Sequence, residues 1–89
     1  MEKKEIRLVF NETSFTNVCK NGFMPYKDAL GTIDIRFNKN DIKTLCKGDM
    51  LVIDNDDIKI LIILQDLGLD YIREIVRRSP IFSDLALEI

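Results

Sequence analysis

Residues 5–20 and 32–47 carry the same pattern of side chains, and this repeat constrains the fold more than any other feature of the chain. In both segments apolar residues first alternate with polar ones, as in a strand with one buried face, and then recur at helical spacing after an asparagine. The identical pairs are Ile6/Ile33, Phe10/Phe37, Asn11/Asn38, Cys19/Cys46 and Lys20/Lys47. The sequence therefore predicts two repeats, each a strand followed by a short helix.

The second half of the chain predicts a β-hairpin and a longer helix. Residues 50–64 read as two apolar strands around an acidic turn at 54–57, and residues from about 67 to 79 have apolar side chains at helical spacing. Pro80 prevents that helix from continuing. The tail, residues 80–89, stays apolar to its end, and its alternation favours a terminal strand as much as a frayed helix.

These elements predict a single α+β domain spanning residues 1–89. We expect a small mixed or antiparallel sheet of four to five strands, built from the two repeats and the hairpin and packed against the one C-terminal amphipathic helix. A domain of 89 residues buries only about 60 to 65% of the surface of its unfolded chain, so one small core is expected.

Composition excludes several classes of function. The chain has no histidine, which removes the most common general base and zinc ligand, and it contains no phosphate-binding or nucleophile motif. We therefore expect no enzymatic activity, cofactor or metal. The two cysteines, Cys19 and Cys46, are expected to be reduced, buried hydrophobes. The longest apolar run, residues 60–64, is too short to span a membrane, and the start of the chain lacks a signal-peptide pattern, so a cytoplasmic protein is expected.

The segment 58–64 is apolar on both strand faces except at Lys59, whereas a strand that is wet on one side should alternate. Both of its faces therefore require cover. The C-terminal helix can supply one cover. The other comes from the C-terminal tail acting as a lid, from a second copy of the chain or from a partner.

Charge is segregated along the chain: residues 1–48 carry a net charge of +3 and residues 49–89 a net charge of −5. Together with the apolar strand surface, this pattern predicts a protein-binding module, for example a small inhibitor or regulator of the kind that phages and other mobile elements encode. Another protein is the expected partner, a homodimer is a further expectation, and nucleic acid ranks behind both. The candidate contact residues are Tyr26, Asp54, Asp56, Asp57, Arg73 and Arg77.

A second interpretation comes from residues 33–60. The strand, short helix, Gly48-Asp49 and following hairpin resemble the AbrB-type transition regulators and related antitoxins. That resemblance implies a dimeric, swapped-hairpin fold that binds DNA. The positions carrying it are Ile33, Ile35, Asp41, Ile42, Leu45, Gly48, Asp49, Leu51, Ile53, Lys59 and Ile60. DNA would then contact the basic half, through Lys3, Lys4, Arg7, Lys39, Lys43 and Lys47.

Overall fold

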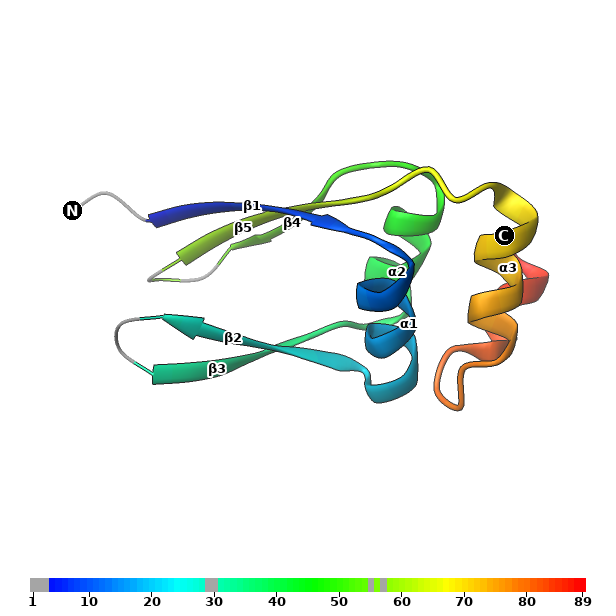
Figure 1. Ribbon diagram of the computed structural model, residues 1–89, viewed down its shortest axis with the longest axis horizontal. Helices are drawn as coiled ribbons and strands as arrows, with labels where there is room; N and C mark the ends of the chain where they lie inside the picture. Colours follow the sequence, from blue (N-terminus) through cyan, green and yellow to red (C-terminus); the bar gives the residue numbers. More distant parts are fainter. Residues whose placement is uncertain (1–3, 29–30, 55, 57) are drawn as a thin grey trace.

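The computed structural model describes residues 4–28, 31–54, 56 and 58–89, which form five strands, three α-helices and one 3-10 helix. Their order along the chain is shown in Figure 1. The elements are β1 (Lys4–Phe10), α1 (Glu12–Asn21), β2 (Phe23–Asp28), β3 (Gly31–Arg36), α2 (Lys39–Cys46), β4 (Leu51–Asp54), β5 (Ile58–Leu64), α3 (Leu69–Arg77) and η1 (Ser83–Leu87).

The strands form two sheets rather than the single sheet expected from the sequence. In the first, β5 lies in the centre, parallel to β1 and antiparallel to β4; in the second, β2 pairs antiparallel with β3. Figure 1 shows the two sheets as separate layers. The inner face of each sheet is apolar, and stacking the two inner faces removes both from water, which a single sheet covered by one helix would not achieve.

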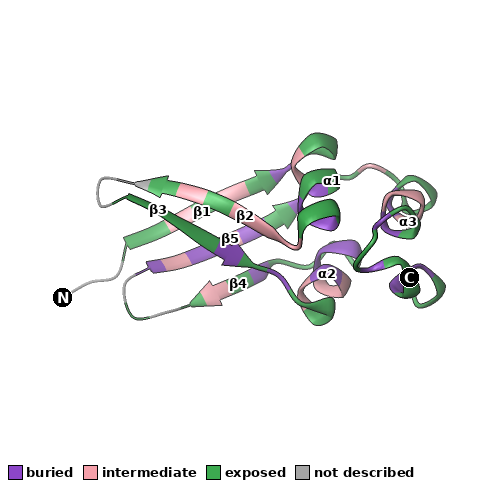
Figure 2. Ribbon diagram, turned by 90° about the horizontal axis from the view of Figure 1, so that it is seen from below, coloured by how far each residue is buried: buried purple, intermediate pink, exposed green. Residues whose placement is uncertain are grey.

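The core lies between the sheets and continues under α1 and α2, which close one end of the layers (Figure 2). The rings of Phe10, at the end of β1, and Phe37, directly after β3, meet edge to face with their centroids 5.9 Å apart. From the helices, the buried residues are Phe15, Val18 and Cys19 in α1 and Ile42, Leu45 and Cys46 in α2.

Both short helices begin at an asparagine, for a physical reason visible in the sequence. The Asn11 side chain accepts a hydrogen bond from the backbone N–H of Ser14, and Asn38 accepts one from that of Asp41. At Asn38 the Asp41 carboxylate also accepts from the Asn38 N–H, which completes a capping box. The first helix ends at Gly22, whose φ of 80° is a left-handed conformation that favours glycine.

The C-terminal helix does not pack on a sheet as expected. Helix α3 lies across the far end of the molecule, where it contacts α1 and η1 (Figure 1). A third layer is thereby added beyond α1 and α2, because the core already fills the space between the two sheets. Its buried residues, Ile72 and Val76, belong to the hydrophobic core.

The tail forms the 3-10 helix η1, so the terminal strand proposed from its alternation is wrong, as is its role as a lid over residues 58–64. The buried Ser79 stabilises the turn that connects α3 to η1. Its hydroxyl donates to the Cys19 carbonyl and accepts from the N–H groups of Ile81 and Phe82, so the turn is hydrogen-bonded to α1.

Candidate protein-binding face

The candidate site is the outer face of the three-stranded sheet, on the side away from the core. Strand alternation places Ile58, Ile60, Ile62 and Leu64 of β5 inside, where all four are buried. The other three residues of β5 therefore point outward, together with their register partners on β1 and β4. This outer face consists of Glu5, Arg7 and Val9 from β1, Lys59, Leu61 and Ile63 from β5, and Val52 and Asp54 from β4.

These side chains are arranged in rows across the sheet. Val9 lies beside Ile63, and Leu61 lies between Arg7 and Val52. The four apolar residues Val9, Val52, Leu61 and Ile63 are therefore neighbours, and we call them the apolar outer face. The last row, Glu5, Lys59 and Asp54, alternates in charge and borders this face toward the start of β1.

The apolar outer face is accessible to solvent. Val9 is 63% exposed, Val52 50% and Ile63 41%, and Leu61 is half-buried. No described helix lies over it in Figure 1. A sheet face that stays in water normally carries polar residues at these positions, so the arrangement is typical of a surface that becomes covered.

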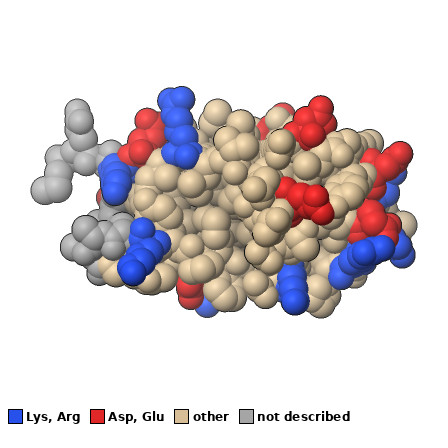
Figure 3. Space-filling model, viewed as in Figure 1, with Lys and Arg blue, Asp and Glu red and all other residues tan. Residues whose placement is uncertain are grey.

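The two-stranded sheet differs at its outer face. Its residues there are Phe23, Pro25, Lys27, Thr32, Asp34 and Arg36, all exposed except the half-buried Phe23. Most of these are polar or charged. Figure 3 shows a third side of the molecule, on which charged side chains lie mainly toward the ends and the middle is largely uncharged.

The structure does not bring the six sequence-predicted contact residues together. Asp54 and Asp56 lie at one end of a molecule 42 Å long, whereas Arg73 and Arg77 lie on α3 at the other end (Figure 1). Tyr26 is half-buried in β2, where it packs against the core rather than standing exposed. Asp57 lies outside the described residues. Of the five that the structure describes, only Asp54 belongs to the outer face of the three-stranded sheet.

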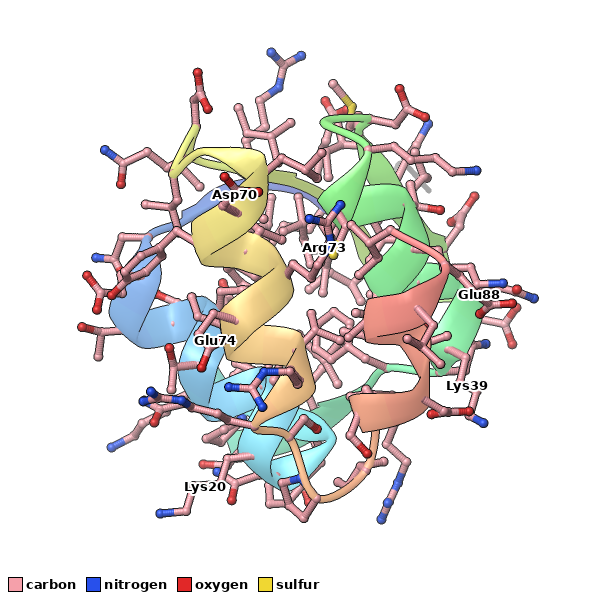
Figure 4. The ribbon with its side chains drawn as sticks, turned by 90° about the vertical axis from the view of Figure 1, so that its right-hand side faces the viewer. Lys20, Lys39, Asp70, Arg73, Glu74 and Glu88 are labelled. Carbon is pink, nitrogen blue, oxygen red and sulfur yellow. The ribbon has the colours of Figure 1, made fainter. Side chains whose placement is uncertain are left out.

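Both arginines of α3 already have partners within the chain. Arg73 points toward the C-terminal segment, where Nε and Nη2 donate to the Ile89 carbonyl at 3.2 and 2.7 Å (Figure 4). Arg77 donates to Glu74 at 2.5 and 3.0 Å, and this bond lowers the pKa of the exposed Glu74 carboxyl. Arg73 thus links α3 to the C-terminal segment, whereas Arg77 pairs within α3 itself.

The basic residues of the DNA-binding interpretation are also dispersed. Lys39 pairs with Asp84 at 2.6 Å and Lys43 with Glu88 at 3.1 Å, both across to the C-terminal segment (Figure 4). Lys4 and Arg7 lie on β1, and Lys47 is exposed at the end of α2. Lys3 lies outside the described residues. Two of the proposed phosphate contacts are thus neutralised by carboxylates, which weakens that interpretation.

The two thiols are buried and free. Burial, together with the nearby Cys46, raises the pKa of Cys19 to about 12, and burial raises that of Cys46 to about 11. Both thiols therefore stay protonated near neutral pH and have little nucleophilic character. Within the described ranges, no three Cys, Asp or Glu side chains form a group that could hold a metal ion, and no helix has the length and apolarity to cross a membrane.

Sequence reasoning identified residues 58–64 as a strand needing cover but missed the contributions of Val9 and Val52. Both valines follow the alternation of their own strands and were open to recognition as outward-facing apolar residues. Assigning them to one face required the order β1-β5-β4, which sequence does not supply. Comparison with protein-family models, curated proteins and solved structures finds no match to this chain, so the site must be interpreted from its own geometry.

Proposed function

We propose that this chain is a non-enzymatic protein-binding module, of the small inhibitor or regulator type, and that it binds its partner through the apolar outer face. The observation supporting this proposal is the exposure of Val9, Val52 and Ile63 as neighbours on one side of a sheet. Apolar patches of this kind are uncommon on surfaces that remain in water and are frequent in the centres of protein interfaces.

The surroundings of the apolar outer face match the layout of an interface. Fully burying one Val, Leu or Ile contributes about 1.5 to 3 kcal/mol, and these residues are already partly covered, so the four together provide roughly 3 to 6 kcal/mol before association entropy is subtracted. The charged row of Glu5, Lys59 and Asp54 then supplies a polar rim that orients the partner. A partner with an apolar centre and both signs of charge at its edge fits this surface.

We also infer that the two strand–helix units, β1–α1 and β3–α2, descend from one duplicated unit. Their equivalent residues Phe10/Phe37 and Cys19/Cys46 are all buried, and both helices begin at an asparagine cap. Duplication would explain how a chain of 89 residues obtained two layers with matching apolar faces. Three residues of the face proposed to bind come from β4 and β5, and the fourth, Val9, stands where the second unit has Arg36.

The proposal is tested by affinity capture from a native lysate with two matched double variants. Val52→Lys with Ile63→Lys places two charges on the apolar outer face, and Pro25→Lys with Thr32→Lys places two on the outer face of the two-stranded sheet. We expect one stoichiometric protein to be captured by wild type and by the second variant and lost with the first. Equal capture by both variants would exclude the apolar outer face as the binding site.

The DNA-binding alternative is separated by the same experiment. Capture is repeated after nuclease treatment and at two salt concentrations, because binding dominated by phosphate contacts falls steeply as salt rises. A protein partner that survives nuclease supports the proposal. Recovery of nucleic acid, with salt-dependent loss, would instead support the regulator interpretation based on residues 33–60.

A further inference from the structure

Strand β1 presents an unpaired backbone edge whose orientation can be derived from one hydrogen bond. The N–H of Gln65 donates to the Phe10 carbonyl at 2.8 Å, so the polar backbone groups of Phe10 point toward β5. Because these groups alternate along a strand, those of Glu5, Arg7 and Val9 point to the opposite edge. Among the described strands none pairs with that edge.

The core-facing side chains of β1 are also incompletely covered. Ile6 and Leu8 are half-buried, whereas their register partners Ile60 and Ile62 on β5 are 1% and 0% exposed. A strand beside β1 would cover these two residues and would pair the free backbone groups of Glu5 and Arg7. The edge is therefore incomplete both in its hydrogen bonds and in its packing.

We propose that a second copy of this chain pairs antiparallel with β1, so that Ile6 of one copy lies opposite Ile6 of the other. In this register Glu5 lies opposite Arg7 of the second copy, and Arg7 opposite its Glu5. Both are hydrogen-bonded pairs, because their backbone groups point to the free edge, so their ion pairs add to backbone bonds. The inference rests on this edge and uses none of the four residues of the apolar outer face.

Charge selects this register over its neighbours. Centring the pairing on Arg7 places the two guanidinium groups of Arg7 directly opposite each other, which is destabilising. Centring it on Leu8 places Arg7 opposite Val9 and leaves Glu5 without an opposite charge. Only the register centred on Ile6 pairs every charged outward-facing residue of β1 with one of opposite sign, and it aligns residues 4–8 of both copies.

The other edges fit a second copy less well. Pro25 in β2 has no N–H to donate, and β4 contains only four residues. Strand β3 carries a comparable pair, Asp34 and Arg36, but β3 ends at Arg36, so centring on Ile35 aligns only residues 34–36. The β1 edge thus provides the longest self-complementary overlap among the described strands.

Pairing through β1 would join the two three-stranded sheets into one continuous sheet of six strands. The two-fold axis at Ile6 runs perpendicular to this sheet, so both apolar outer faces lie on the same side. The dimer would therefore present two copies of the candidate binding face to one partner or to two.

The test is sedimentation equilibrium with charge-reversal variants of the full chain. Wild type is expected as a dimer of the 10.3 kDa chain, and Glu5→Arg or Arg7→Glu alone should weaken dimerisation by about tenfold or more, because each creates two like-charge pairs. Mixing the two variants should restore the dimer, since every pair across the edge is then opposite in charge. Thermal unfolding of each variant checks that the fold is retained.

Two controls distinguish this inference from its alternatives. Asp34→Arg should leave the dimer intact. If Asp34→Arg abolished dimerisation while Glu5→Arg still dimerised normally, the contact would lie on β3 and the proposal would be overturned. A monomer at all concentrations, or a mixture no stronger than either variant alone, would also overturn it. The double variant Val52→Lys with Ile63→Lys should still dimerise, so failure of the binding-face proposal is recognised separately.

Discussion

The outer faces of the two sheets differ although both sheets cover the same core. On the two-stranded sheet four of the six outward positions are polar or charged, and only Phe23 and Pro25 are apolar. On the three-stranded sheet the outward positions combine four charged residues with four neighbouring apolar ones, Val9, Val52, Leu61 and Ile63. Composition cannot explain the difference, because the same 89-residue chain supplies both faces. The larger group of neighbouring apolar residues lies on the three-stranded sheet, and we therefore assign binding to that side.

The largest effect on stability is expected from a substitution on the inner side of the three-stranded sheet, compared with one on its outer side. Replacing the fully buried Ile62 by alanine should lower the free energy of unfolding by about 2 to 5 kcal/mol, since the core cannot fill the cavity. Ile63→Ala, one residue further on, should lower it by less than about 1 kcal/mol. Urea unfolding measures both. Equal losses would mean that Ile63 is covered in the isolated chain.

The shared interior is tested by alkaline pH. The pKa values of Cys19 and Cys46, about 12 and about 11, exceed the ordinary value of 9.0, so the unfolded chain releases these protons first. Stability from the neutral thiols is therefore complete below pH 9 and is lost as pH rises from 9 toward 12. Urea unfolding of wild type and of Cys19→Ala with Cys46→Ala should show wild type losing stability relative to the variant in that window. A constant difference would contradict thiol burial.

A smaller effect should separate the charged rows of the two outer faces. Lys59 lies between Glu5 and Asp54, so Lys59→Glu aligns three carboxylates across the sheet and should destabilise it by about 0.5 to 2 kcal/mol. Lys27 lies opposite the uncharged Thr32, and Lys27→Glu should change stability by less than about 0.5 kcal/mol. Thermal unfolding at low and high salt measures the difference, which should shrink with salt; an unchanged difference would exclude charge as its cause.

Only a small change in stability should accompany the variant that alters the apolar outer face most. Val52→Lys with Ile63→Lys should shift the free energy of unfolding by less than about 1 kcal/mol, because neither side chain is fully buried. The same variant should lose most of the fluorescence of an apolar dye bound to wild type. Pro25→Lys with Thr32→Lys should retain that fluorescence, and a parallel loss there would show that the dye binds elsewhere.

Much of the local structure could be predicted from sequence, because it depends on neighbours along the chain. Alternation around Ile6 and Ile33 indicated strands, and Asn11 and Asn38 indicated where helices begin. The division into two sheets could not be predicted. The division depends on the pairing of β1 with β5, which joins residues far apart in the sequence that no local pattern connects.

The candidate site was predicted only where one strand contained its whole signal. The apolar segment 58–64 was recognisable from sequence, but its neighbours on the sheet were not, and the acidic turn was predicted as a contact site from its charge alone. The tail shows a related limit. Leu85 and Leu87 alternate as in a strand, yet they lie in a 3-10 helix because the hydrogen bonds of Ser79 start that segment against α1.

The parallel pairing of β1 with β5 also determines when this molecule can first become complete during synthesis. Lys4 pairs with Ile58 and Phe10 with Leu64, so each pair joins residues 54 positions apart. Strand β1 precedes β5 along the chain and cannot pair until β5 has been made. Until then Ile6, Leu8 and Phe10 lack their native contacts with β5. Such non-local closure is slow compared with helix formation. Until β5 has been made, the edge of β1 that pairs with it is therefore open to other strands.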